Sequence, residues 1–478
     1  MLKKFLRVTL PLLLLAPAIL TFGQQTSPEF NSDWSVLGKR ILTINAIIRV
    51  NQIEVARDKN VGTDESDLHD AEAARRFRKA VLDGMPSAKV TWAFSWLALQ
   101  DSRPNYVELR QQIVEFHRLY GDEITFIPGA FFGPIYNSRE QLNRDIHDGL
   151  NLVSQMVGEG YRPHAIVAGF LAAENLRFLA EEENIHVAQG TIWSQYGIDN
   201  GDGDGSICYP YYPSKEHACK PAQGKPTRGK PGQEKPDQEK NDFIDCVNLD
   251  GWTCDFVCAR RFGYEEGGNS RLGVGPIETY RNMGAERGLA ESLAITATHF
   301  DDHIKNNGFG WITVAWELSL VRGCQDYVTD CLTLWLKEIH QRWPDAIVPL
   351  LGEFGEAWRH DFADNSALNY HFVQRGTGVA GAHSEPNTEI EWFMNQKFRL
   401  ALLRDLDNDT EPMVIDFTRY DLKAAEPADP TPDNPTRNWS LVNRINQKHQ
   451  RSEDQPIRIE ELTEEERALI ESAVSIKE

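Results

Sequence analysis

The chain has 478 residues, of which 41% are hydrophobic, 10% aromatic and 25% charged. This composition predicts a globular protein with one large core and an accessory domain, and it excludes a disordered chain. The formal net charge of -21 argues against nucleic acid or another anionic polymer as the main partner, because dense phosphate or sulfate would repel the protein. We therefore expect a neutral partner.

The first residues predict export. Residues 1–7 contain three basic side chains, residues 8–22 are mainly apolar, and a polar stretch begins at Gly23. The apolar run is shorter than the about 20 residues that span a bilayer, so we interpret residues 1–23 as a signal peptide and expect no stable membrane span after its cleavage. A retained membrane anchor is the alternative. The mature protein is then expected in the periplasm or secreted.

From residue 40 onward, apolar strand-like runs alternate with amphipathic helical runs. The predicted strands are 40–50, 89–99, 123–128, 165–171, 185–192, 243–249, 311–316 and 347–351, and the predicted helices are 64–82, 106–120, 138–158, 176–183, 281–305 and 332–343. Seven or eight such units indicate an α/β fold, a closed parallel (β/α)7-8 barrel, which we place at residues 31–361.

Two polar stretches interrupt the barrel pattern. Residues 220–241 are dominated by Lys, Gly, Pro, Gln and Glu, so they have little apolar surface to bury and are predicted to be a disordered insertion. Before them, Asp199, Asp202 and Asp204 alternate with glycines. Three carboxylates packed so closely repel one another unless a cation offsets them, so this loop is a candidate site for a structural calcium ion. A solvated turn is the alternative, and no cofactor is otherwise required.

Seven cysteines lie between Cys208 and Cys331, and disulfides form readily in exported proteins. Cys208 with Cys219, and Cys324 with Cys331, could each close a loop. The odd count leaves at least one thiol unpaired within the monomer. Cys254 and Cys258 lack a second pair at a spacing typical of zinc sites, so we predict no zinc site.

Beyond about residue 361 the pattern changes to strand-like runs at 368–373, 392–404 and 413–420, without regular helices between them. We predict a small β-rich C-terminal domain at residues 362–423. Residues 424–478 are then a Pro-rich linker followed by a charged helix.

Two acids follow predicted barrel strands and are the leading catalytic candidates. Glu174 ends the strand-like run 165–171 just before a helix, and Glu317 follows the run 311–316 in the same way. In a barrel of alternating strands and helices, the catalytic groups lie where strands end and loops begin. A helix-capping or ion-pair role is the alternative for each.

The same segments resemble known families. Gly169 to Glu174 looks like the nucleophile segment of glycoside hydrolase family 57. The longer runs 193–214, 248–255 and 270–278 resemble an exported bacterial family catalogued as domain-of-unknown-function family 3863. That second resemblance covers most of the mature chain but brings no established activity. The segments 310–317 and 347–353 are similar to the last units of the wider glycoside hydrolase/polysaccharide deacetylase barrel superfamily.

The superfamily resemblance implies roles for individual residues. Glycoside cleavage needs two carboxyl groups across the scissile bond, and the resemblance places Glu174 as the nucleophile and Glu317 as the acid/base. Family 57 uses an Asp in a different segment for the second role, so Asp250, Asp255 and Glu353 are rival acids. Stacking and polar contacts to the sugar are expected from residues near these acids, namely Trp193, Tyr209, Trp252, Arg271 and Trp316.

Deacetylation is disfavoured, because deacetylases of this superfamily hold a metal with an Asp pair and a His pair. This chain has Asn45 and Asn51 in the first region and no histidine pair at 129–136. The sequence therefore predicts an exported carbohydrate-active enzyme, a glycoside hydrolase acting on a neutral oligosaccharide or polysaccharide. The alternative is a barrel that binds glycan without cleaving it.

Overall fold

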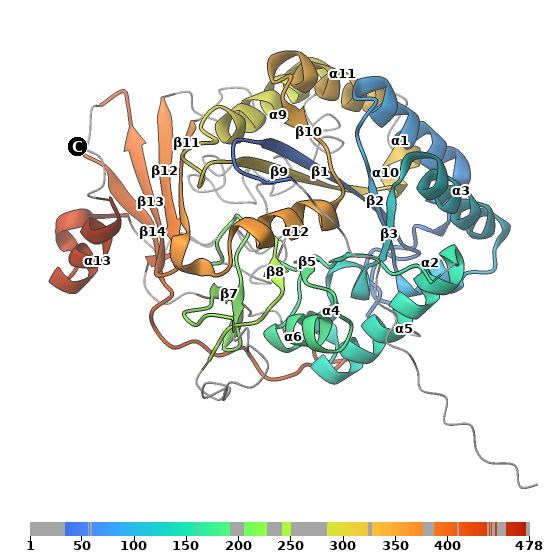
Figure 1. The fold of residues 1–478 in the computed structure, drawn as a ribbon, viewed down its shortest axis with the longest axis horizontal. Helices are drawn as coiled ribbons and strands as arrows, with labels where there is room; N and C mark the ends of the chain where they lie inside the picture. The colour runs from blue at the N-terminus through green and yellow to red at the C-terminus, as the bar shows by residue number, and fades with distance from the viewer. Residues whose placement is uncertain are drawn as a thin grey trace, which may run out of the picture. The chain divides into compact units, whose positions relative to one another are not determined.

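The computed structural model describes residues 34–55, 57, 60–158, 160–191, 205–226, 241–249, 284–323, 327–375, 387–408, 411–436, 439, 441, 445–446 and 456–474. Strands and helices alternate along the first three quarters of this part of the chain (Figure 1). The strands are β1 (Arg40–Ile48), β2 (Thr91–Phe94), β3 (Glu123–Phe126), β4 (Ala165–Val167), β5 (Val187–Gln189), β8 (Val247–Asn248), β9 (Gly310–Glu317) and β10 (Ala346–Ile347).

Two parallel sheets form the centre. The first has the order β9-β1-β2-β3, and β10 pairs with Arg40 and Ile41 at the start of β1. The second has the order β4-β5-β8. Thr125 on β3 donates a hydrogen bond to the Ala165 carbonyl on β4, which links the two sheets at 2.6 Å. The strands thus follow the order of a (β/α) barrel, but within the described residues no ladder joins β8 to β9, so closure of the predicted barrel is not shown.

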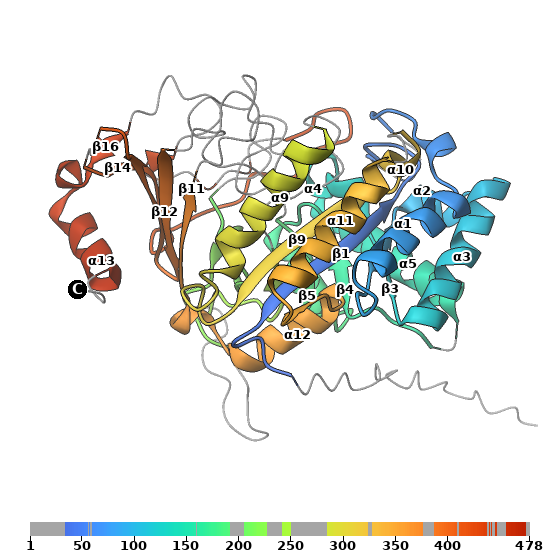
Figure 2. The same cartoon turned by 90° about the horizontal axis from the view of Figure 1, so that it is seen from above.

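The helices form an outer layer on the sheets. They are α1 (Ala71–Gly84), α3 (Pro104–Tyr120), α5 (Arg139–Val157), α6 (Ala173–Glu181), α9 (Ala285–Phe300) and α11 (Tyr327–Arg342), with the short α2 (Trp96–Gln100), α4 (Gly133–Tyr136) and α10 (Ser319–Gly323) at strand ends. Successive members of the series α9, α11, α1, α3, α5 and α6 contact one another, and Figure 2 shows α9 and α11 lying along β9 and β1. Each helix buries one apolar face, as expected for helices that cover a sheet.

Side chains of β1 alternate between the two faces of its sheet, as the pleat requires. Leu42, Ile44 and Ala46 pack in the core beneath the helices, whereas Ile41 and Ile47 pack on the opposite, inner face. Polar groups also meet on that inner face. The Asn45 side-chain amide donates to Gln189 Oε1 on β5 at 2.6 Å, and Gln189 Nε2 donates to Thr313 Oγ1 on β9 at 3.1 Å. Strands of both sheets therefore face the same interior.

Helix α12 (Leu351–Asp361) covers the amino ends of the strands. It follows β10, which pairs with the first residues of β1, and it contacts β1, β4 and β5. Phe354 stacks on Trp311 with ring centroids 4.9 Å apart. A Cβ at Gly355 would lie 2.3 Å from Val187, so only glycine permits this close approach. The carboxyl ends of the strands lie at the other end of the sheets.

A separate antiparallel sheet follows the parallel ones, as the sequence predicts. Its strands are β11 (Asn369–Arg375), β12 (Thr388–Asn395), β13 (Phe398–Asp405), β14 (Met413–Arg419), β15 (Ile445–Asn446) and β16 (Ile457–Arg458). The predicted single run 392–404 is in fact parts of β12 and β13, joined by a turn at residues 395–398. Helix α13 (Glu464–Val474) packs on this sheet through Ile470. Asn31–Glu478 cluster as one unit, because Tyr370 on β11 packs on Tyr209 of the main body.

The predicted Pro-rich linker makes specific contacts with the main body. Glu426 accepts hydrogen bonds from the backbone amides of Ala173 and Ala218 at 2.8 and 2.9 Å, and it pairs with Arg139 at 2.9 Å. Further along, the buried Trp439 packs edge-on against Phe170 at 5.3 Å. Glu426 thus occupies the amino end of α6, whose own N-cap residue is an alanine without a polar side chain.

Two other predictions are corrected by the structure. The predicted insertion at residues 220–241 begins too early, because Lys220 belongs to β7 (His217–Pro221) and is buried, while β6 (Pro213–Ser214) pairs with it. No disulfide joins Cys208 to Cys219, so the first of the two possible bridges is not formed. Cys324 lies outside the described residues. Within the described residues, no helix is long and apolar enough to cross a membrane.

Candidate active site

Glu317 is the last residue of β9, at the carboxyl end of the sheet. It follows Trp311, Thr313 and Ala315 at every second position, so it points to the same inner face as they do. Its register partner is Ile47, which is also on the inner face. The Glu317 side chain is 15% exposed. A partly accessible acid at the carboxyl end of a central parallel strand is where barrel enzymes place their chemistry.

Arg49 lies beside Glu317. It directly follows β1, and its side chain is 1% exposed. Arg49 Nη2 is 3.0 Å from Glu317 Oε1, while Nε and Nη2 donate to the two carboxylate oxygens of Glu65 at 2.7 and 2.9 Å. Burial would lower the pKa of Arg49, but the charges of Glu317 and Glu65 raise it instead. One guanidinium therefore joins two carboxylates.

Glu65 comes from the loop between β1 and α1. Burial would raise its pKa, but the neighbouring His69 and Arg49 outweigh burial and lower the pKa to about 2. His69 Nε2 lies 3.6 Å from Glu65 Oε2, which is too long for a strong hydrogen bond. Burial lowers the pKa of His69, against the effect of Glu65. Glu65 is consequently a permanent anion at neutral pH.

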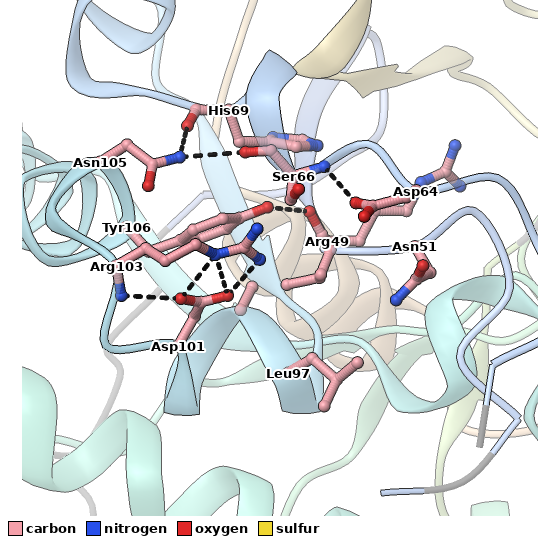
Figure 3. Close-up of polar contacts among 12 residues, drawn as sticks. Arg49, Asn51, Asp64, Ser66, His69, Leu97, Asp101, Arg103, Asn105 and Tyr106 are labelled. Carbon is pink, nitrogen blue, oxygen red and sulfur yellow. Dashed lines mark hydrogen bonds and ion pairs between the residues drawn. The ribbon is translucent and has the colours of Figure 1, made fainter. Parts of the chain in front are cut away.

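Hydrogen bonds from α3 hold this loop and Arg49 in place. Figure 3 shows the Tyr106 hydroxyl donating to the Arg49 carbonyl, at 2.7 Å. The Asn105 side-chain amide donates to the carbonyls of Ser66 and His69 at 3.0 and 2.9 Å (Figure 3). The residues on either side of Glu65 are thus tied to the helix layer, and the ion-pair cluster has a fixed support.

The loop after β1 is ordered by a second buried acid, Glu54. Its carboxylate accepts hydrogen bonds from Val50 N at 2.9 Å, Ser95 Oγ at 2.7 Å and Leu97 N at 3.2 Å. Burial raises the pKa of Glu54, although these donors act in the opposite direction. The contacts join the ends of β1 and β2, so Glu54 stabilises the loops around the site.

The chain is conformationally strained after β3. Gly129, Ala130 and Phe131 have φ values of 62°, 47° and 87°. Non-glycine residues pay a cost for a positive φ, and such strain persists most often at functional sites. The Phe131 ring lies 5.8 Å from the Arg49 guanidinium carbon, and Gly169 beyond β4 has no room for a Cβ, which would lie 2.7 Å from Phe131. The strained turn thus places an aromatic ring on Arg49.

Glu174, the leading candidate from sequence, has different neighbours. It is exposed in the first turn of α6. It lines a surface cavity of about 530 Å³ together with Arg139, Ala173, Arg177, Lys215, Glu216 and residues 424–426. Glu317 is not among them. The prediction that Glu174 and Glu317 face each other across the barrel mouth stays a prediction.

Three other predicted site residues are engaged in contacts that stabilise the fold. Glu353 lies on α12, at the amino ends of the strands, where it pairs with Lys89 and accepts from Leu350 N at 3.0 Å. Trp316 is 2% exposed and packs on Phe77 at 5.3 Å beneath the helices. Tyr209 is fully buried against Tyr370 and Trp311. These two aromatic side chains leave no open face for a sugar.

The remaining predicted residues lie outside the described part of the chain, namely Trp193, Asp199, Asp202, Asp204, Asp250, Trp252, Asp255 and Arg271. Among the residues that are described, no group of three or more His, Cys, Asp or Glu side chains is arranged to hold a metal ion.

The sequence analysis missed Arg49, Glu65 and Glu54. Arg49 carried a partial signal, because it is a basic residue near the end of the predicted strand-like run 40–50. Glu65 and Glu54 carried none, since their contacts to β1 and β2 depend on how the intervening loop folds back.

Fold and site together define an α/β protein of parallel strands with a carboxylate-guanidinium cluster at the strands' carboxyl ends. The chain belongs to the family described as a domain of unknown function with a solved structure, DUF3863, whose model matches residues 35–231 and 230–394. The predicted family membership is thereby confirmed. A second model described in the same way, DUF3864, matches residues 399–475.

Comparison with solved structures identifies a relative that is similar over most of the chain. A candidate glycoside hydrolase/deacetylase from Parabacteroides distasonis is 46% identical, with a TM-score of 0.83 over 92% of this chain and 98% of the other. A GH57 branching enzyme from Thermococcus kodakaraensis is 11% identical over 66% of this chain and 70% of its own, with a TM-score of 0.37. A candidate polysaccharide deacetylase from Mycobacterium smegmatis is 13% identical over 68% of this chain and 92% of its own, with a TM-score of 0.33. These last two similarities are too weak to inform function. A search among curated proteins found no match.

Proposed function

We propose that this protein is a carbohydrate-active enzyme that hydrolyses glycosidic bonds in a neutral glycan, with Glu317 as one of two catalytic carboxyl groups. The observation that carries the proposal is the inward-facing Glu317 at the end of β9, 3.0 Å from a buried arginine. The 46% identical relative described as a candidate glycoside hydrolase/deacetylase supports the same class of substrate. The net charge of -21 favours a glycan without negative charge.

Glycoside hydrolysis uses two carboxyl groups on either side of the scissile bond. One attacks the anomeric carbon or activates water, and the other donates a proton to the leaving oxygen. Glu317 is the first member of this pair. The second is Glu174, Asp250 or Asp255, each of which follows a strand of the α/β body in the sequence.

The test is a hydrolysis screen of the purified protein on a panel of neutral oligosaccharides and polysaccharides. Glu317→Gln keeps the size and hydrogen bonding of the side chain but removes its charge, so it should reduce turnover by at least about 100-fold. Glu174→Gln, Asp250→Asn and Asp255→Asn then identify the partner. Glu140→Gln is the matched control, because Glu140 is an exposed glutamate on α5.

Other outcomes of the screen would replace this proposal. Release of acetate from acetylated glycans without chain cleavage would assign a deacetylase. Glycan binding without any product would assign a binding barrel whose carboxylates accept hydrogen bonds from sugar hydroxyls. Full activity in Glu317→Gln would remove Glu317 from the catalytic pair.

We also propose export to the periplasm or the medium, and a calcium ion at Asp199, Asp202 and Asp204. Both proposals rest on the sequence alone. Mass spectrometry of the mature N-terminus tests the first. Thermal unfolding with a chelator and then with added calcium tests the second, because an ion that binds the folded state raises its stability by about 2.7 kcal/mol at a hundredfold excess over its dissociation constant.

A further inference from the structure

The cluster around Arg49 distinguishes the two oxygens of Glu317. Oε1 is 3.0 Å from Arg49 Nη2. In the described part of the chain, no side chain or backbone amide bonds to Oε2, and the side chain keeps an exposed fraction of 15%. One oxygen of Glu317 is therefore anchored by Arg49, and the side chain as a whole keeps partial access to solvent.

Arg49 is itself fixed from three directions. Glu65 occupies its Nε and Nη2 edge with a two-point hydrogen bond, Tyr106 holds its backbone carbonyl, and the Phe131 ring lies against the guanidinium. A planar guanidinium paired at two points has little freedom to rotate. The direction in which Nη2 points toward Glu317 is therefore set by Glu65 and not by the substrate.

We propose that Arg49 and Glu65 are positioning residues that fix one oxygen of Glu317 in an ion pair, so that Glu317 acts as the nucleophile or general base and not as the proton donor. A proton donor has to be neutral before it reacts, which proteins achieve by burying the acid or placing it near like charge. Glu317 instead lies 3.0 Å from a guanidinium, which is the opposite arrangement. This inference rests on the proposed function, and it reverses the acid/base role that the sequence resemblance implies for Glu317.

The two carboxyl groups then have different roles in the reaction. As the nucleophile, Glu317 Oε2 bonds to the anomeric carbon while the glycosidic C–O bond breaks, and the second carboxylic acid gives its proton to the leaving oxygen. Water then attacks the same carbon, its proton returns to the second carboxylate, and Glu317 leaves as a carboxylate. As the base, Glu317 takes the proton from water as its oxygen attacks. In both routes the donor is the other acid, which the screen assigns among Glu174, Asp250 and Asp255.

The first test needs no substrate. The free energies of unfolding of the wild type, Arg49→Met, Glu317→Gln and the double variant form a cycle. An ion pair between the two residues predicts that the two single effects do not add. Additive effects would overturn the positioning role, whatever the enzyme does. Arg144→Met is the matched control, because Arg144 pairs with the exposed Glu140 on α5 and not with Glu317.

The second test uses aryl glycosides whose leaving groups differ in basicity. Loss of a proton donor is tolerated with an acidic leaving group such as dinitrophenolate, whereas loss of the nucleophile or base is not. We expect Glu317→Gln to lose activity on both kinds of substrate. We expect Arg49→Lys, which keeps the charge but not the two-point geometry, to lower kcat by roughly 100-fold with little change in KM.

The outcomes separate the two proposals. Retained dinitrophenyl glycosidase activity in Glu317→Gln would make Glu317 the proton donor and overturn the inference while leaving the hydrolase intact. A wild type that hydrolyses no glycoside would overturn the proposed function and the catalytic role together. Should Arg49→Met fail to fold, Arg49→Lys replaces it in the cycle.

Discussion

Replacing Glu65 by Gln should make the free energy of unfolding much less dependent on pH in the acidic range. In the folded protein the contacts with His69 and Arg49 hold the pKa of Glu65 at about 2, against an ordinary value of 4.5. A difference of this size corresponds to about 3 kcal/mol at 1.36 kcal/mol for each pKa unit. Because the side chain keeps some contact with solvent, about 2–3 kcal/mol is the more realistic contribution.

The sign of the pH effect follows from the lowered pKa. Glu65 stabilises the folded state fully above its unfolded-state pKa of about 4.5, and this contribution is lost as the pH falls toward about 2. The wild type should therefore be more stable than Glu65→Gln by about 2–3 kcal/mol at pH 7. That difference should shrink below pH 4.5 and disappear near pH 2.

Urea unfolding followed by tryptophan fluorescence and circular dichroism at pH 7, 4 and 3 measures this difference, provided that the two probes give coincident transitions. Glu140→Gln serves as the control, because the exposed Glu140 should contribute less than about 0.5 kcal/mol at any of these pH values. A difference between wild type and Glu65→Gln that stays constant from pH 7 to pH 3 would refute the assignment of the low pKa to Glu65.

Three further changes test the packing. Gly149→Ala should destabilise the protein by about 1–3 kcal/mol despite the better helix propensity of alanine, because the new Cβ would lie 2.6 Å from the Phe126 ring; chemical unfolding would show this, and a stabilised variant would contradict it. Arg399→Met should cost about 3–5 kcal/mol because it removes the cation that lies 2.6 Å from the fully buried Asp416, and replacing both residues by apolar ones should recover part of the loss. Deleting residues 227–240 should shift Tm by no more than about 2 °C in calorimetry, and a larger fall would show that the segment docks.

Periodicity predicted most of the central elements, because helix and strand patterns are local properties of the chain. The run 40–50 became β1, and the helical run 106–120 became α3 with its buried face intact. The predicted strand 347–351 is shorter in the structure than in the prediction. Only Ala346–Ile347 pair as a strand, and α12 begins at Leu351 because Glu353 accepts from Leu350 N and caps the helix. That capping competes with strand formation and is invisible to an apolar pattern.

The candidate site was predictable in part for the same reason. Glu317 was found because an acid at a strand end is a local signal, and Arg49 carries a similar signal after β1. Glu65 is 16 residues from Arg49 in sequence, and its role depends on a loop anchored by α3. Tyr209 was expected to contact a sugar, but it is completely buried against Tyr370 and Trp311. Whether such a side chain is buried depends on packing between segments far apart in the chain, which cannot be inferred from local patterns in a single sequence.

The turn between β12 and β13 has a consequence for how this protein can be divided. One family model ends at residue 394 and the other begins at residue 399, so their border falls within this hairpin. Seven residue pairs from Thr388↔Asp405 to Met394↔Arg399 cross that border. A gene that encoded only one of the two parts would expose a full-length sheet edge, which invites aggregation. The two sequence families should therefore be inherited together, and expression of either half alone should yield insoluble protein.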